Sequence, residues 1–142
     1  MVNISVEGEF EFSAEKLWGL ISNFGEINWV PGLEKVELEG EGVGMVRHVY
    51  FPLLPKLEER LDAINYEKMI VDYSIPSVEY IKVKNYRARA QVIELDSEHC
   101  KVVWSCVSAE ADGATEAQAT ANTEALYKDF MTWIYDFLKK KG

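Results

Sequence analysis

The sequence has few basic residues, which argues against binding to negatively charged partners such as nucleic acids. Its 142 residues include 15 lysines and arginines against 24 aspartates and glutamates, which gives a formal net charge of −9. Proteins that bind nucleic acids present basic faces to the phosphate backbone. Here basic residues gather only at 82–89 and in the last few positions. We therefore expect no binding to DNA, RNA or an anionic membrane surface.

Long hydrophobic runs are also missing. No apolar stretch approaches the ~18 residues that a membrane-spanning helix needs. Residues 1–12 alternate apolar with acidic side chains, whereas a secretory leader has a basic and then an apolar region. These two absences predict a cytoplasmic protein with no membrane insertion.

Only two cysteines are present, six positions apart in a segment that alternates like a strand. Six strand residues span roughly 20 Å, whereas a disulfide requires Cα atoms within about 7 Å of each other. Cys100 and Cys106 therefore should not pair within the chain. Cys106 shares a strand face with Trp104 and is expected to be an inert core residue.

Residues that hold metals or phosphate groups are equally scarce. The two histidines, His48 and His99, are far apart in the sequence, and strand parity directs His48 away from the core. The glycine-rich stretch 40–44 joins two strand-like segments, whereas a phosphate-binding loop opens a helix. We expect neither a metal site nor a bound cofactor.

The most regular pattern that is present predicts a long amphipathic helix over residues 114–141. Its apolar residues recur at helical spacing on one side, and its charged residues lie on the other. At ~1.5 Å per residue it is roughly 40 Å long, enough to lie across a whole sheet. Residues up to 125 are mostly small or polar, and those beyond are bulky and aromatic. The small half is expected to leave room beside the helix, unless its alanines only favour helix formation.

Most of the remaining chain alternates with period two, which indicates strands. We predict about seven of them, at residues 4–12, 33–39, 45–50, 57–66, 69–75, 80–95 and 100–111. A short helix follows its N-cap Ser13, a second short helical piece is predicted at 26–29, and a turn is predicted at 76–77. Strands without alternating helices form an antiparallel sheet. The sequence thus predicts one α+β domain over residues 1–142, with a curved antiparallel sheet, two short helices after the first strand and a long C-terminal helix.

Four short motifs, taken in order, carry a family resemblance. They are residues 28–32 (Asn-Trp-Val-Pro-Gly), 42–47 (Gly-Val-Gly-Met-Val-Arg), 59–61 (Glu-Arg-Leu) and 102–104 (Val-Val-Trp). With the order of the elements, they resemble the START/Bet v 1-like (SRPBCC) superfamily. Within it, they are similar to the polyketide cyclase/dehydrase and lipid-transport branch, which includes the plant lachrymatory-factor synthase-like proteins. The resemblance covers essentially the whole chain. It implies a helix-grip fold, in which the sheet wraps around the long helix and leaves an internal cavity for a small apolar or amphipathic molecule.

Arg47 and Glu59 are predicted to face this cavity. If Phe10 and Leu61 point inward, strand alternation turns Glu59 and Ala63 inward on one strand and Arg47 inward on its neighbour. A lone buried charge costs several kcal/mol, so the two residues need each other or a polar ligand. The resemblance implies the same pair, since lachrymatory-factor synthases use an arginine and a glutamate on corresponding strands. The alternative is an ordinary cross-strand ion pair with no chemical role.

The same parity selects side chains that would line the cavity. It turns Tyr73 and Tyr86 inward, and it would also bury Lys84, so that strand is expected to begin late or to contain a bulge. Core packing or local hydrogen bonds would explain each candidate equally well. The predicted ligand-binding residues are Trp29, Met45, Leu61, Tyr73, Tyr86, Ala88, Ala90, Trp104, Asn122, Thr123 and Tyr127.

Functions of different classes fit these residues. The one we expect is binding of a small hydrophobic or amphipathic molecule in the internal cavity, by a carrier or sensor. The alternative is an enzyme of the cyclase, dehydratase or isomerase type, in which Glu59 moves a proton and Arg47 stabilises the developing oxyanion. A further alternative is a protein-interaction module that uses the apolar loop 51–56, which also suits a lid over the cavity. The sequence leaves the oligomeric state open.

Overall fold

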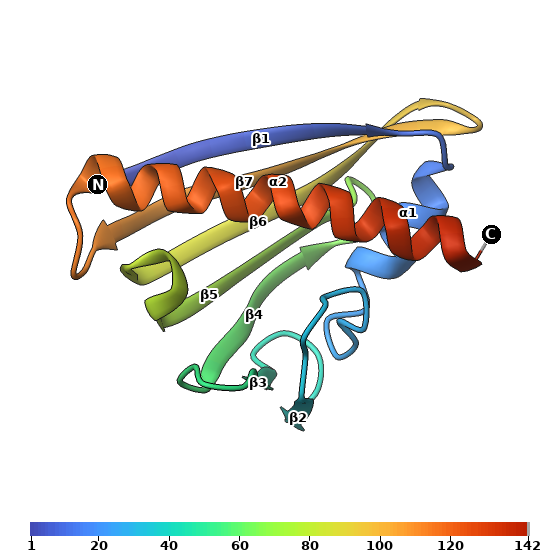
Figure 1. The fold of residues 1–142 in the computed structure, drawn as a ribbon. Coiled ribbons are helices and arrows are strands. Elements are labelled where there is room, and N and C mark those ends of the chain that lie inside the picture. The colour runs from blue at the N-terminus through green and yellow to red at the C-terminus, as the bar shows by residue number, and fades with distance from the viewer. Residues whose placement is uncertain (142) are drawn as a thin grey trace.

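The computed structural model describes residues 1–141, and its main feature is a seven-stranded antiparallel sheet with one long helix lying over it (Figure 1). The strands alternate buried and exposed side chains along most of their length. They are β1 (Val2–Phe10), β2 (Lys35–Glu39), β3 (Val46–Tyr50), β4 (Leu57–Asn65), β5 (Ile70–Val78), β6 (Val83–Asp96) and β7 (His99–Ala111). The other elements are helix α1 (Ala14–Ile21), a short 3-10 helix η1 (Glu79–Ile81) and helix α2 (Glu116–Lys141).

The strand order in the sheet is β1-β7-β6-β5-β4-β3-β2, so the first strand pairs with the last and all others pair with their neighbours in the chain. Every pairing is antiparallel. Short connections therefore join the strands from β2 to β7, whereas the segment from β1 to β2, which includes α1, passes from one edge of the sheet to the other. The predicted α+β class, the predicted strand number and the long C-terminal helix are confirmed.

Both helices begin at caps that satisfy free backbone N–H groups. The Ser13 hydroxyl accepts a hydrogen bond from the Lys16 N–H at 3.2 Å, as its predicted role as N-cap requires. Helix α2 begins at Glu116, slightly later than predicted, because Thr115 and Gln118 form a reciprocal capping box. The Gln118 N–H donates to the Thr115 hydroxyl at 3.1 Å, and the Thr115 N–H donates to the Gln118 side-chain oxygen at 2.9 Å.

The second short helix predicted at 26–29 is wrong, because this segment forms turns. The Glu26 carboxylate accepts hydrogen bonds from the side chains of Asn23 at 3.1 Å and Asn28 at 3.0 Å. Such local side-chain hydrogen bonds compete with helix formation and stabilise turns. The loop they hold carries Phe24, Ile27 and Trp29, all of which are buried.

The turn predicted at 76–77 is also wrong, since β5 continues through Pro76 to Val78 and the chain reverses at η1. Proline cannot donate to a strand ladder, which usually ends the strand. Pro76 is tolerated because it has no partner in the β5–β6 pairing, which runs from Ile75 opposite Tyr86 to Ser77 opposite Lys84.

Two bulges change which side chains face inward. The predicted bulge near Lys84 is confirmed, because Asn85 has a positive φ of 51° and Lys84 is exposed. A second register shift, between Leu61 and Ala63, was not expected. It turns Ala63 outward and lets Ile64 pack on the core instead, so the inward orientation predicted for Ala63 is wrong.

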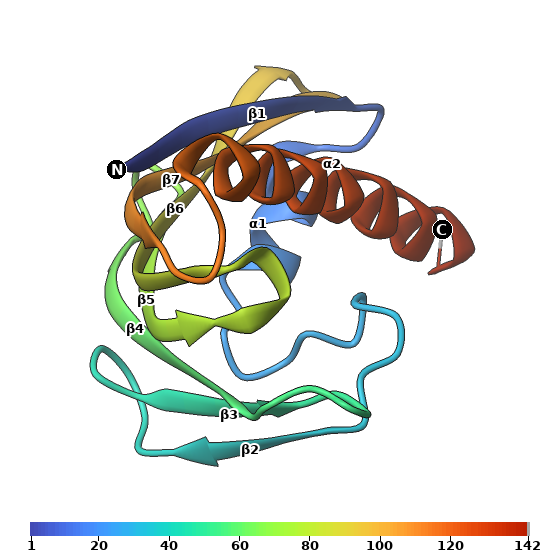
Figure 2. The same cartoon turned by 60° about the vertical axis from the view of Figure 1, so that its left-hand side comes forward.

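Helix α2 packs on the β1 and β7 side of the sheet, while β2 and β3 form the far edge (Figure 2). The helix approaches β1 closely at Gly8, where an added Cβ would lie 2.9 Å from the sulfur of Met131. Cys100 and Cys106 are buried in the sheet and unpaired, as predicted, and burial raises the pKa of both thiols to about 11. No helix within residues 1–141 has the length and apolar composition that crossing a membrane requires.

Candidate functional site

A cavity of about 370 Å³ lies between the sheet and the second half of α2. Its size falls in the range of small-molecule sites, roughly 300 to 1,000 Å³. Its walls come from the loop 27–31, strands β3 to β7, the loop 51–56, η1 and three residues of α2, namely Leu126, Phe130 and Trp133. Apolar and aromatic side chains dominate this lining, as is usual where a protein holds a small organic molecule.

The cavity lies beside the bulky half of α2, so the expectation that the small half leaves room is wrong. Ala119 and Thr123, in the small half, are fully buried against the rest of the protein. Because these side chains are small, the helix backbone packs close to its neighbours and leaves no space beside this half of α2. The bulky residues Leu126, Phe130 and Trp133 line the hollow instead.

An aromatic cluster forms one wall of the cavity. The ring centres of Trp104 and Phe130 are 4.9 Å apart, and the Trp29 ring lies edge-on to Phe130 at 5.6 Å and to Trp104 at 6.1 Å. Trp133 continues the cluster, with its ring 5.9 Å from that of Phe130. Edge-to-face and tilted contacts of this kind are the favoured geometries of aromatic pairs, so the wall is well packed.

Arg47 and Glu59 form a buried ion pair that also lines the cavity. They are direct cross-strand partners on β3 and β4, and their side chains are both about nine-tenths buried. The Nε and Nη2 atoms of Arg47 lie 2.7 and 2.5 Å from the same carboxylate oxygen, Oε1 of Glu59. The Arg47 Nη1 donates to the Phe24 carbonyl at 2.8 Å, and the guanidinium lies 3.9 Å from the centre of the Phe24 ring.

The second carboxylate oxygen of Glu59 is free. No residue within 1–141 donates a hydrogen bond to Oε2. Within residues 1–141, His48 Nδ1 is the only side-chain N or O atom that is both fully buried and without a hydrogen-bond partner. Since Oε2 has no partner either, it must be partly accessible to solvent. Glu59 lines the cavity, and Oε2 is the carboxylate oxygen that Arg47 does not use.

A row of hydrogen-bonded aromatic side chains links the sheet to α2. The Trp104 Nε1–H donates to the Tyr73 hydroxyl at 2.9 Å, the Tyr73 and Tyr86 hydroxyls are 3.4 Å apart, and those of Tyr86 and Tyr127 are 2.5 Å apart. Burial raises the pKa of Tyr73 to about 12 and raises the pKa of Tyr86 and Tyr127 well above the ordinary value. These hydroxyls therefore remain protonated and bonded to each other at neutral pH.

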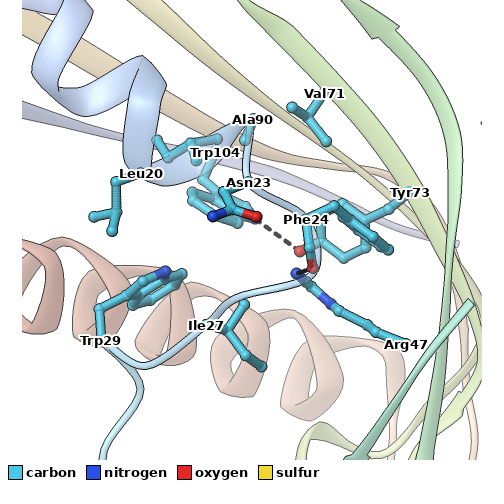
Figure 3. Close-up of a pocket in the computed structure, with 11 residues that line it drawn as sticks. Leu20, Asn23, Phe24, Ile27, Trp29, Arg47, Val71, Tyr73, Ala90 and Trp104 are labelled. Atoms are coloured by element: carbon cyan, nitrogen blue, oxygen red, sulfur yellow. Dashed lines mark hydrogen bonds between the residues drawn. The ribbon is translucent and has the colours of Figure 1, made fainter. Parts of the chain in front are cut away.

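A small recess of about 20 Å³ adjoins the cavity, and Figure 3 shows its walls. They come from α1, the segment after it and strands β3, β5, β6 and β7. It shares five residues with the larger space, namely Ile27, Trp29, Arg47, Tyr73 and Trp104. A site of this volume has room for one water molecule.

The structure gathers some of the residues predicted from the sequence and separates others. Trp29, Tyr73, Tyr86 and Trp104 line the large cavity together with Arg47 and Glu59. Ala90 lines the small recess only. The remaining predicted residues line neither of these two hollows, and they are Met45, Leu61, Ala88, Asn122, Thr123 and Tyr127.

Local contacts explain the three polar side chains of α2 that were predicted to bind a ligand. The Thr123 hydroxyl donates back to the Ala119 carbonyl at 2.8 Å, and the Asn122 amide lies 3.5 Å from the Ile81 carbonyl. Tyr127 is fully buried and bonded to Tyr86. These are the ordinary structural contacts that competed with a binding role for each of them.

Several lining residues were not among the predicted ligand-binding residues. Strand parity turns Val49 and Ile75 inward with Arg47 and Tyr73, and both line the cavity. Phe130 and Trp133 belong to the apolar stripe of the predicted helix, but its spacing cannot tell core from cavity wall. The lining residues of η1 (Glu79–Ile81) were not found, because the sequence analysis placed the chain reversal at 76–77, before η1.

Metal binding has no support in the described part of the chain. Within residues 1–141, no three His, Cys, Asp or Glu side chains lie close enough to hold a metal ion. His48 contacts Glu39 at 2.9 Å outside the cavity lining, and His99 pairs with Asp96 at 2.8 Å at the exposed β6–β7 turn.

A curved antiparallel sheet, a long C-terminal helix and a cavity between them define a helix-grip fold, which is a ligand-binding class of protein. Residues 1–132 match the family model described as polyketide cyclase / dehydrase and lipid transport. The chain belongs to this family, and the resemblance to the START/Bet v 1-like superfamily is confirmed.

Solved structures with the same fold support this assignment. The protein XoxI from Bacillus cereus is 26% identical with a TM-score of 0.85, and 100% of this chain aligns with 99% of that chain. An uncharacterised protein from Bacillus thuringiensis is 26% identical with a TM-score of 0.84, covering 95% of this chain and 97% of its own. Norcoclaurine synthase from Thalictrum flavum, solved with a transition-state analogue, has a TM-score of 0.72 at 20% identity, with coverage of 99% and 96%, and shows the shared fold alone. No curated protein sequence matches the chain.

Proposed function

We propose that this protein binds a small, largely apolar molecule in the cavity between the sheet and α2, as a carrier or sensor. The observation that carries the proposal is the cavity itself, about 370 Å³ in volume with a mostly apolar lining. A closely packed interior rarely leaves a hollow much larger than a water molecule. When an apolar ligand moves from water into this space, its transfer free energy is favourable by roughly 25 cal/mol for each Å² of apolar surface buried.

The lining contains two buried charged residues, Arg47 and Glu59, whereas its other charged residues, Lys56 and Glu79, are exposed. Arg47 and Glu59 lie together on neighbouring strands and would orient a ligand by its polar end. A small number of placed polar groups in an apolar pocket is the usual source of ligand orientation and specificity. The family description, which joins cyclase/dehydrase activity with lipid transport, is consistent with an amphipathic ligand.

The enzyme alternative also has a specific observation in its favour. The free Oε2 of Glu59 is suited to accept a proton from a bound substrate, with the Arg47 charge close by. Against this role, the Arg47 guanidinium already donates from Nε to Glu59 Oε1 and from Nη1 to the Phe24 carbonyl, and its Nη2 lies against the same Glu59 oxygen. An oxyanion would have to compete with those contacts, and for this reason we favour a carrier or sensor.

A substitution that fills the cavity tests the proposal. Val49 is buried and lines the cavity, so Val49→Trp should block binding of an environment-sensitive apolar dye, with at least a tenfold higher Kd. The control is Val107→Trp, the same change at an exposed strand position, which should bind the dye as the parent does. Circular dichroism checks that both variants fold. If the folded Val49→Trp variant binds the dye unchanged, the cavity is not the binding site.

A further inference from the structure

Tyr127 lies outside the cavity, yet it contacts three residues that line it. It belongs to α2 and is fully buried. Its ring centre lies 5.7 Å from that of Phe130 and 6.4 Å from that of Trp104, and its hydroxyl oxygen lies 2.5 Å from that of Tyr86. All three of these neighbours belong to the lining. The hydroxyl contact therefore ties a polar group of the cavity wall to a residue that lies behind the wall.

The row of hydrogen-bonded side chains that includes this contact has a donor at one end. The indole N–H of Trp104 can only donate, so the Tyr73 hydroxyl accepts there. Each phenol has one proton of its own to donate. If Tyr73 donates to Tyr86 across 3.4 Å, Tyr86 in turn donates to Tyr127 across 2.5 Å. The Tyr127 proton then needs an acceptor beyond the three hydroxyls.

Cys106 supplies an acceptor at the other end of the row. Burial raises the pKa of its thiol, and a hydrogen bond from Tyr127 opposes this rise, as expected when the sulfur accepts the hydroxyl proton. The thiol in turn donates to the Val2 carbonyl, with the sulfur 3.6 Å from the oxygen. Every donor then has an acceptor, whereas the opposite direction leaves the Tyr73 proton without a partner in the row. The row therefore runs from Trp104 towards Cys106.

This direction decides what the wall offers a ligand. Tyr86 lines the cavity, but its proton points to Tyr127. We infer that Tyr127 is a specificity-determining residue, which takes the Tyr86 proton and thereby makes the cavity prefer a ligand with hydrocarbon, and no carbonyl or other acceptor, against Tyr86. An acceptor at this point would lose its hydrogen bonds to water and gain none in return. The inference rests on the proposed binding function and names the ligand surface that this wall accepts.

Two naphthalenes of the same shape test the inference. In 2-acetylnaphthalene a carbonyl oxygen stands where 2-isopropenylnaphthalene has a CH₂ group, so only the ketone carries an acceptor. Displacement of the environment-sensitive apolar dye from the full chain gives a Kd for each probe. The quantity compared between variants is the ketone ratio, defined as the affinity of the ketone divided by that of the hydrocarbon. Arg47 is the same in every variant, so any donor that it offers cancels in this comparison.

Tyr127→Phe should raise the ketone ratio about fivefold, the gain expected from one neutral hydrogen bond. The Tyr86 proton loses its acceptor in this variant and can turn to the carbonyl of the ligand. The hydrocarbon should bind as it does to the wild-type chain, because the phenylalanine ring keeps the packing. The control is Tyr135→Phe, the same change at a partly exposed position of α2 outside the lining, which should keep the wild-type ratio.

A pair of changes at Cys106 tests the direction of the row without altering a hydroxyl. Cys106→Ala removes the acceptor at the far end, so the row can reverse and release a proton at the cavity end, which should also raise the ketone ratio. Cys106→Ser keeps an acceptor and should retain the wild-type ratio. If Tyr127→Phe does not fold, this pair decides, and an unchanged ratio in Cys106→Ala overturns the inference.

The outcomes separate the inference from the proposed function. If a folded Tyr127→Phe variant binds both probes with the wild-type ratio, or loses affinity for both equally, Tyr127 withholds no donor and the inference is wrong, while the binding function stands. If the chain binds the dye but neither probe, the wall does not accept hydrocarbon, which also overturns the inference. If neither the dye nor the probes bind, the proposed function is wrong as well.

Discussion

Arg47 and Glu59 face the cavity as an ion pair, and a single substitution reveals how strongly they depend on each other. In Glu59→Gln the buried guanidinium loses its counter-charge, which should lower the free energy of unfolding by about 3 kcal/mol. The comparison is Asp72→Asn, which breaks the more exposed pair with Arg89, and whose cost should stay below about 1 kcal/mol. Urea unfolding measures both values.

Two results would contradict this description of the pair. A loss for Glu59→Gln as small as that for Asp72→Asn would mean that water screens the pair. A folded variant with unchanged stability but a large loss of turnover, once a substrate is known, would favour the enzyme alternative over the carrier.

Residue positions were predictable where strand alternation is regular. Arg47 and Tyr73 lie in uninterrupted strand segments, and parity turned them inward correctly. Ala63 was misplaced because one extra residue in a bulge reverses the faces beyond it, and nothing in the local composition marks that bulge. Thr123 faces the buried side of α2 as predicted, but whether it meets a ligand or its own helix is decided by distances that spacing does not contain.

Among the elements, α2 and β1 depend on a close approach at Gly8. An added Cβ at this position would lie 2.9 Å from the Met131 sulfur and 3.3 Å from its Cβ, so Gly8→Ala should destabilise the protein by about 1 to 3 kcal/mol. Gly19→Ala is the control, because Gly19 lies in α1 with nothing within 4 Å of the added carbon, and alanine favours a helix. Thermal unfolding compares the two.

A second substitution tests whether the Met131 side chain causes the loss of stability. Adding Met131→Ala to Gly8→Ala removes the clash, so the double variant should lose less stability than the sum of its single changes. Strict additivity would mean that the helix does not rest on β1 at this point.

The loop 51–56 is the element predicted to act as a lid, and the structure places Leu54 in the cavity lining. Leu54→Ser should speed dye release several-fold with little effect on the unfolding midpoint, because the side chain is 40% exposed and contributes little to the core. Leu53 is fully exposed and outside the lining, so Leu53→Ser is a matched control that should leave release unchanged. Stopped-flow dilution of the dye complex measures the rates. Equal effects of the two changes would contradict a lid role for Leu54.

Elements with a strong periodic pattern were predicted well, and those defined by a few turn residues were not. The long stripe of α2 and the alternation of β1 leave little choice of structure. The segment 26–29 was misjudged because the Glu26 side chain accepts hydrogen bonds from two nearby asparagines, which hold the chain in a loop. Pro76 was taken as a strand end, but β5 continues through it at a position that has no partner in the pairing with β6.

For the whole molecule, the position of the cavity follows from how α2 lies over the sheet. The small half of the helix packs close to the sheet, and the bulky half bounds a hollow whose other walls are strands β3 to β7 and the loops at their ends. The sequence predicted a cavity through its family resemblance, but it placed the space beside the wrong half of the helix. Packing distance between elements is a property of the assembled fold, and a one-dimensional pattern does not encode it.

The four tryptophans provide the most direct test of this cavity as the binding site. Trp29, Trp104 and Trp133 line it, whereas Trp18 lies outside the lining and packs against Tyr66 at 5.8 Å. Fluorine NMR of the protein labelled with 5-fluorotryptophan gives one signal for each of the four. Saturation with the environment-sensitive apolar dye should shift the signals of Trp29, Trp104 and Trp133 and leave that of Trp18 unchanged. A ligand that binds and shifts only Trp18, or none of the four, would contradict the account.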